Sequence, residues 1–190
     1  MFTGLYNFEL EVGPHQPLSP HWTTLAERLT EHGYATGGFV ANPVYTTRMS
    51  GLHQGFIRYK ELPINASRVL AASEFSRLTL DKLWSLVGMG PQHGRTAGDV
   101  TADFIDWIEE PRGNRPFFAF LNFFDAHSPY SPPVEDGELF WERPSESWYT
   151  FYDRWLSDPD SVYTPESVES WVGMYDSAIR YMDAELARLR

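Results

Sequence analysis

An aspartate and a histidine stand two residues apart where a mostly apolar run of the sequence ends. The run is "FFAFLNF", residues 117–123, and Asp125 and His127 follow it. Such a run predicts a central strand that is apolar on both faces. Ligands of open α/β sheets bind beyond the carboxyl ends of the strands, and an imidazole there can bind an anionic oxygen or exchange a proton near neutral pH. His127 is therefore the candidate catalytic residue.

Both side chains also have a purely structural interpretation. His127 would then be a loop histidine bonded to a backbone carbonyl, and the sequence favours neither interpretation. Asp125 either orients the imidazole ring next to a substrate or caps the turn by bonding its own backbone. Because Pro129, Pro132 and Pro133 restrict the chain after the histidine, we expect the turn to be rigid.

Helix and strand patterns place this turn in an α/β fold. Residues 20–32 predict a helix that stops at Gly33, and residues 34–41 predict a short buried strand. Residues 97–109 predict an amphipathic helix, which the strand at 117–123 follows. Two helix-then-strand steps indicate a mainly parallel sheet flanked by helices.

The remaining segments show weaker helix and strand patterns, except for the segment at the end of the chain. We expect an irregular connection over residues 43–65, a helix over 66–87 and an ordered surface excursion over 134–163. A long helix is predicted from about Pro165, with an apolar seam that packs against its own sheet, since about three heptads are short for a coiled coil. The seam consists of Val168, Val172, Tyr175, Ile179, Met182, Leu186 and Leu189.

The composition excludes several partners and chemistries. A chain of 190 residues is one domain or a large part of a bigger one. A net charge of -11 disfavours nucleic acid and anionic membranes as partners. Without cysteine, the chain has no disulfide, thiolate metal site or cysteine nucleophile. It also shows no apolar run of bilayer length and no signal peptide, which favours a cytoplasmic location.

The stretch at residues 117–133 resembles a strand and turn of the sulfatase family, within the alkaline-phosphatase superfamily. There an apolar strand precedes Asp-x-His-x-Pro-Tyr-x-x-Pro, which is matched by Asp125, His127, Pro129, Tyr130 and Pro133. Four other segments resemble family motifs in the family's order: "FTGLY" (2–6), "TTLAERLTEHGYATGGFVAN" (23–42), "GLHQGFIRY" (51–59) and "YDSAIRYMDAELARL" (175–189). On these five motifs the chain is identified as a member of the sulfatase family.

This resemblance implies a partial alkaline-phosphatase-like fold and a sulfuric ester hydrolase acting on a small-molecule sulfate ester. In the family, a cysteine or serine is converted to formylglycine, whose hydrate attacks the ester, and a divalent cation, usually calcium, polarises the sulfate. His127 matches the family histidine that contacts the sulfate or protonates the leaving oxygen. Asn42 falls near the family's Lys-Trp-His segment, where it is expected to contact an oxyanion.

The chain also departs from the family pattern. The nucleophile motif Cys/Ser-x-Pro-x-Arg and an aspartate pair would lie before Met1, and the Asp-His-Gly metal motif would lie after Arg190. We therefore interpret residues 1–190 as a single incomplete sulfatase-type catalytic domain, which holds no metal ligands and is inactive alone. Two alternatives stay open: a phosphoester or phosphonate hydrolase of the same superfamily, and a degenerate, non-catalytic binding protein. The second is suggested by "NFELE" at residues 7–11, which replaces the family's "PHEHG".

Overall fold

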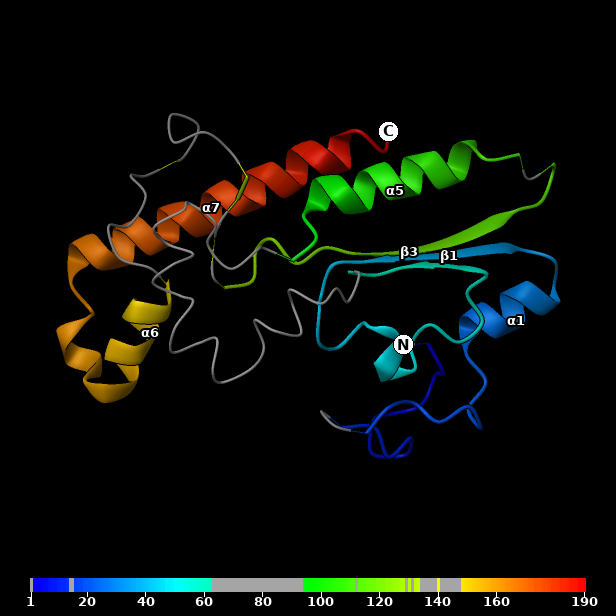
Figure 1. Ribbon diagram of the computed structural model, residues 1–190, viewed down its shortest axis with the longest axis horizontal. Coiled ribbons are helices and arrows are strands. Elements are labelled where there is room, and N and C mark those ends of the chain that lie inside the picture. Colours follow the sequence, from blue (N-terminus) through cyan, green and yellow to red (C-terminus); the bar gives the residue numbers. More distant parts are fainter. Residues whose placement is uncertain are drawn as a thin grey trace, which may run out of the picture. The chain divides into compact units, whose positions relative to one another are not determined.

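Figure 1 shows the computed structural model of the chain. The chain forms two compact units. The first unit comprises Met1–Arg95 and Gly113–Phe120, and the second comprises Thr96–Arg112 and Leu121–Arg190. The predicted helix at 66–87 and much of the predicted excursion at 134–163 lie outside the described residues. The described residues are 2–13, 16–62, 94–111, 113–128, 130, 132–133, 140 and 148–190.

Helix α1 (Leu25–Glu31) leads into strand β1 (Ala35–Val40) in the first unit. The helix is shorter than the predicted 20–32 because a capping box formed by Thr24 and Glu27 sets its first turn. Its end is as predicted: Gly33 takes a left-handed φ of 84° and turns the chain into the strand. All six residues of β1 are buried, which confirms the predicted buried strand.

The sheet has the strand order β2-β1-β3, with β2 at Arg58–Lys60 and β3 at Phe117–Asn122. Strand β1 pairs with β2 in parallel and is the middle strand (Figure 1). Strand β3 forms as predicted but lies at the edge of the described sheet, with five of its six residues half-buried. The central place of β3 stays a prediction, because the order β2-β1-β3 covers only the three strands of the described residues.

Strand β2 lies inside the segment predicted to be irregular, so that prediction is wrong for residues 58–60. Hydroxyl groups fix the loop before it. Thr24 Oγ1 donates to Gln54 O (2.9 Å), while Thr30 Oγ1 and Thr36 Oγ1 lie 2.8 Å and 2.9 Å from Gly55 O. A three-residue strand is too short to show periodicity, and the side chains that align it come from α1 and β1.

The second unit contains α5 (Ala97–Glu109), α6 (Trp148–Ser157) and α7 (Pro165–Ala187). It also has a single turn of 3-10 helix at Pro159–Ser161 (η3), and the first unit has one at Arg48–Ser50 (η1). Helices α5 and α7 pack against each other, as Figure 1 shows. Each begins with a threonine capping box, at Thr96 and Thr164, and the predicted bounds of α5 are confirmed.

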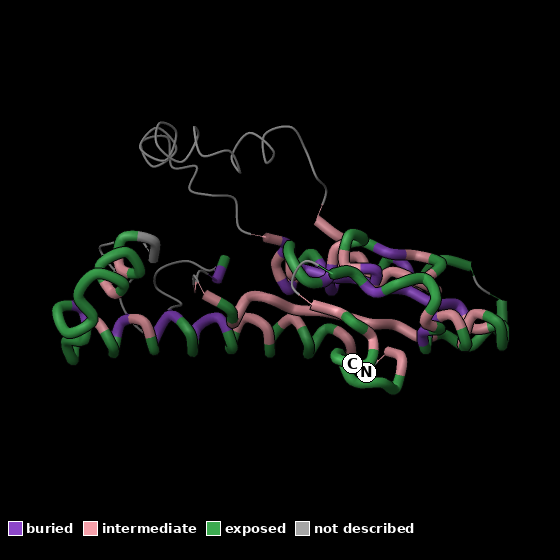
Figure 2. The backbone as a smooth tube through the Cα atoms, turned by 90° about the horizontal axis from the view of Figure 1, so that it is seen from below, coloured by how far each residue is buried: buried purple, intermediate pink, exposed green. Residues whose placement is uncertain are grey.

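The buried face of α7 is not the predicted apolar seam. Small residues dominate the buried face, which consists of Ser170, Gly173, Met174, Ser177 and Ala178. Five seam residues are instead between 40% and 51% exposed: Val168, Val172, Tyr175, Ile179 and Leu186. Figure 2 shows the resulting alternation of buried and exposed residues along the helix. The prediction failed because it ranked faces by apolar character, whereas small residues allow closer helix packing.

Candidate functional site

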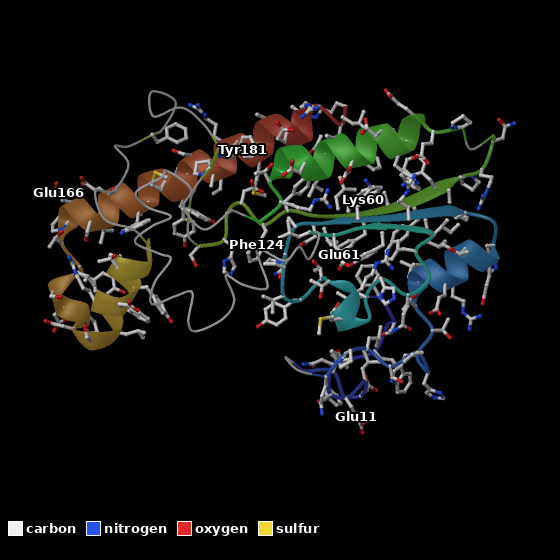
Figure 3. The ribbon with its side chains drawn as sticks, viewed as in Figure 1. Glu11, Lys60, Glu61, Phe124, Glu166 and Tyr181 are labelled. Atoms are coloured by element: carbon white, nitrogen blue, oxygen red, sulfur yellow. The ribbon has the colours of Figure 1, made fainter. Side chains whose placement is uncertain are left out.

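His127 lies in a tight turn that follows β3, beside Phe124, which Figure 3 labels. Its backbone N–H donates to Phe124 O (3.0 Å), and its exposed ring stacks on the Phe124 ring with centroids 4.2 Å apart and planes at 19°. His127 Nδ1 lies 2.7 Å from Ser128 O. Because a carbonyl oxygen only accepts, Nδ1 carries a hydrogen, which makes Nε2 an acceptor in the neutral ring and a donor in the protonated ring.

The Asp125 carboxylate bonds to a helix instead of to the His127 ring. Its Oδ1 accepts a hydrogen bond from the Ala97 N–H (3.0 Å), the first amide of α5. Its Oδ2 is buried and has no hydrogen-bond partner within the described part of the chain. Burial raises the pKa of the Asp125 carboxyl and the nearby Asp99 raises it further, while hydrogen bonds from backbone N–H groups act in the opposite direction.

A second side chain reaches the same helix end from α7. Tyr181 Oη accepts a hydrogen bond from the Gly98 N–H (3.1 Å), the second amide of α5. A Cβ atom at residue 98 would lie only 2.7 Å from that oxygen, so glycine is required for this approach. Sequence reasoning missed Tyr181, because it appeared only as part of a family motif. Figure 3 labels Tyr181 on α7 and Phe124 in the turn.

Asn42 follows β1 in the first unit, and its side-chain oxygen organises the next loop. Asn42 Oδ1 accepts hydrogen bonds from the Val44 and Tyr45 N–H groups, both at 2.9 Å, and Asn42 O accepts one from Thr46 Oγ1 at 2.9 Å. This is an Asx-type turn. The side-chain oxygen thus serves the loop, and a contact with an oxyanion would have to come from the amide nitrogen.

Arg95 is a buried cation of the first unit that the sequence did not identify. It is 8% exposed, and its Nη1 donates to Lys60 O (2.7 Å) and Val40 O (3.3 Å). These carbonyls belong to the last residues of β2 and β1, at the carboxyl edge of the sheet, where ligands of α/β folds gather. The sequence signal was weak: one arginine between a glycine and the Thr96 capping box.

The described residues do not fit the divalent cation that the family resemblance implies. No three histidine, aspartate or glutamate side chains gather in the part of the chain that the structure describes. Hard cations such as calcium require several oxygen ligands, and the described residues do not bring such a group together.

None of the described helices has the length and apolar character needed to cross a membrane.

Comparison with known proteins gives a family and a fold. A phosphonate monoester hydrolase of Agrobacterium radiobacter is similar with a TM-score of 0.59 and 18% identity, over 99% of this chain and 47% of that chain. A Vibrio parahaemolyticus protein of the alkaline phosphatase superfamily gives a TM-score of 0.44 at 17% identity, over 98% and 34% of the two chains. No curated protein matches.

The chain thus spans about half the length of the Agrobacterium enzyme, whose likeness shows the fold. The predicted α/β, alkaline-phosphatase-like class, with a parallel sheet flanked by helices, is confirmed. The model of the family described as Sulfatase matches residues 1–190. Since this match covers every residue of the sequence, the chain belongs to the sulfatase family.

Proposed function

We propose that this chain forms part of a hydrolase that cleaves sulfuric esters, and that His127 acts on the ester. The observation that carries the proposal is the match of the sulfatase family model to all 190 residues. The turn after β3 supports it, because it presents an exposed imidazole whose Nδ1 is bonded to a backbone carbonyl.

The proposed role of His127 is proton donation to the leaving oxygen, or binding of a sulfate oxygen. With Nδ1 bonded to Ser128 O, the proton that can leave or arrive sits on Nε2. Phe124 stacks on the ring and restricts its rotation. A leaving oxygen that gains a proton departs as a neutral alcohol or phenol, which avoids the cost of expelling an alkoxide.

We further propose that activity requires groups beyond the described residues. The sequence contains no Cys/Ser-x-Pro-x-Arg motif, so residues 1–190 hold no precursor of a formylglycine nucleophile. A divalent cation, calcium by family resemblance, would also need ligands other than the described residues, among which no group of three suitable side chains gathers. The chain alone is therefore expected to be inactive.

A phosphonate or phosphate monoester hydrolase is the second candidate. The structural likeness to a phosphonate monoester hydrolase favours it, although 18% identity shows only the shared fold. Phosphonate and sulfate esters both place negative charge on tetrahedral oxygens, so His127 would have the same role. The nucleophile and the metal ligands separate the two activities.

Kinetic assays test the proposal, on the chain and on any longer reading frame that contains it together with a nucleophile motif. Hydrolysis of p-nitrophenyl sulfate is compared with that of p-nitrophenyl phenylphosphonate. His127→Ala should lower kcat by roughly 10²- to 10⁴-fold, the usual contribution of general acid–base catalysis. His32→Ala is the matched control, because His32 is also exposed and its Nδ1 also lies 2.7 Å from a backbone carbonyl.

Three outcomes of these assays would change the proposal. Cleavage of only the phosphonate ester would replace the first candidate with the second. An unchanged kcat in His127→Ala would remove this residue from the mechanism. Absence of hydrolysis in a longer chain that has an intact nucleophile motif and bound cation would refute both candidate activities and leave the non-catalytic binding protein.

A further inference from the structure

The first turn of α5 is attached to two other elements of the second unit through consecutive amides. The Ala97 N–H donates to Asp125 Oδ1 (3.0 Å), and the Gly98 N–H donates to Tyr181 Oη (3.1 Å). The first amides of a helix have no partners inside it, so they depend on groups from outside. The turn after β3 and helix α7 therefore hold the same helix end.

The remaining amides of this turn are also occupied. Thr96 Oγ1 accepts a hydrogen bond from the Asp99 N–H (3.2 Å), and Thr96 O accepts one from the Val100 N–H (3.1 Å). The start of this 13-residue helix thus leaves no amide for an anion from solvent. It is a joint between elements of the protein, and not a binding site.

We propose that Tyr181 and Asp125 are positioning residues for His127, an inference that rests on the proposed function. Asp125 sits inside the turn that the hydrogen bond from His127 N–H to Phe124 O closes. Its carboxylate ties that turn to α5, and the Tyr181 hydroxyl ties α5 to α7. A shift of the helix end therefore moves Asp125 and, through the turn, the His127 ring.

The two carboxylate oxygens of Asp125 have different environments. Oδ1 accepts the hydrogen bond from the Ala97 N–H, whereas Oδ2 is buried with no hydrogen-bond partner within the described residues. Asn keeps an oxygen that can accept the Ala97 hydrogen bond and carries no charge. If this accepting oxygen holds the turn, Asp125→Asn keeps the position of the His127 ring and Asp125→Ala does not.

A simpler interpretation assigns both hydrogen bonds to helix packing alone. In that case, loss of the Tyr181 hydroxyl would loosen the start of α5 and leave the His127 ring unchanged. The two interpretations therefore differ in the state of the imidazole, which ¹⁵N and ¹H NMR of the ring report directly. Nitrogen shifts distinguish the Nδ1–H form from the Nε2–H form.

The experiment uses the full 190-residue chain with Tyr181→Phe, Asp125→Ala and Asp125→Asn. Tyr163→Phe is the matched control, because Tyr163 is 58% exposed and lies in the same unit. In Tyr181→Phe, the Gly98 amide should exchange with solvent roughly 2- to 13-fold faster, the effect of one hydrogen bond. The His127 ring signals should move in Tyr181→Phe and Asp125→Ala, and stay near wild type in Asp125→Asn.

Two results would overturn the inference. One is faster exchange at Gly98 with unchanged His127 ring signals, which would make the contact purely structural. The other is an equal effect of Asp125→Asn and Asp125→Ala, which would remove the accepting oxygen from the argument. Amide exchange and ring NMR signals can be measured on an inactive chain. They therefore test the positioning role even if the proposed function is wrong. In an active longer chain, Tyr181→Phe should lower kcat about 10- to 100-fold with little change in KM.

Discussion

Two fully buried threonines have opposite hydrogen-bond environments, so one substitution should have opposite effects at the two sites. Thr36 and Thr101 are both 0% exposed. Thr36 Oγ1 accepts a hydrogen bond from the Ile57 N–H (3.0 Å) and lies 2.9 Å from Gly55 O. The Thr101 hydroxyl is buried in α5 with no hydrogen-bond partner among the described residues. Valine has nearly the shape of threonine and carries a methyl group in place of the hydroxyl.

The change in the free energy of unfolding depends on whether loss of the hydroxyl leaves another buried group without a hydrogen-bond partner. Thr36→Val leaves the Ile57 N–H without a partner, which costs about 2 kcal/mol, while Gly55 O keeps the Thr30 hydroxyl as a donor. Thr101→Val removes an unsatisfied buried group and should stabilise by about 1 kcal/mol, because threonine and valine have similar helix propensities. With a urea m-value of about 2 kcal/mol/M, the midpoints should shift by about -1 M and +0.5 M.

Urea titration followed by residue-resolved NMR measures each unit separately, since Thr36 and Thr101 belong to different units. Thr36→Ser is the control that keeps the hydroxyl, and it should lose less stability than Thr36→Val. A loss of stability in Thr101→Val equal to that in Thr36→Val would refute the reasoning, because hydrogen-bond satisfaction would then not decide the cost.

Three further substitutions test other features. Gly38→Ala should destabilise the first unit by about 1–3 kcal/mol in urea titration, because the new Cβ would lie 2.5 Å from a ring carbon of the buried Tyr59. Asn42→Ala should cost about 1 kcal/mol, whereas Asn42→Asp, which keeps the accepting oxygen, should melt near wild type; equal losses would contradict the Asx-turn role. Burial raises the pKa of Asp125 in the folded protein above its value in the unfolded chain. The stability that comes from this raised pKa is therefore complete below the unfolded pKa, and it is lost as pH rises through the folded pKa. Asp125→Asn should therefore gain stability over the wild type as pH rises through that window, and a constant difference would contradict the shift.

Elements with a local signal could be predicted from the sequence. Helix α5 has a capping box at one end and an apolar period along its length, so its bounds were correct. Strand β1 follows a glycine that ends α1, which marked its start. The turn that carries His127 was recognised because its motif is contiguous.

Contacts between distant residues could not be predicted. The bond between Gly98 and Tyr181 joins residues 83 positions apart, and the bond between Ala97 and Asp125 joins residues 28 apart. Neither contact leaves a pattern in the local sequence. His127 could therefore be predicted as a site residue, but the contacts of Asp125 and Tyr181 with α5 could not. Helix α7 shows that a clear local pattern can also mislead. Its regular apolar spacing predicted one buried face, but the face that is buried consists mainly of small residues.

The approach of Tyr181 to Gly98 also has a consequence for how related sequences diverge. A side chain at residue 98 would collide with the Tyr181 hydroxyl, so the two positions are not free to change independently. A lineage that replaces Tyr181 with a smaller residue releases residue 98 to become alanine, which favours helix. With alanine at residue 98 first, the Tyr181 hydroxyl has to move, and its hydrogen bond with the amide of residue 98 is lost. Among homologues, glycine at residue 98 should therefore accompany tyrosine at residue 181.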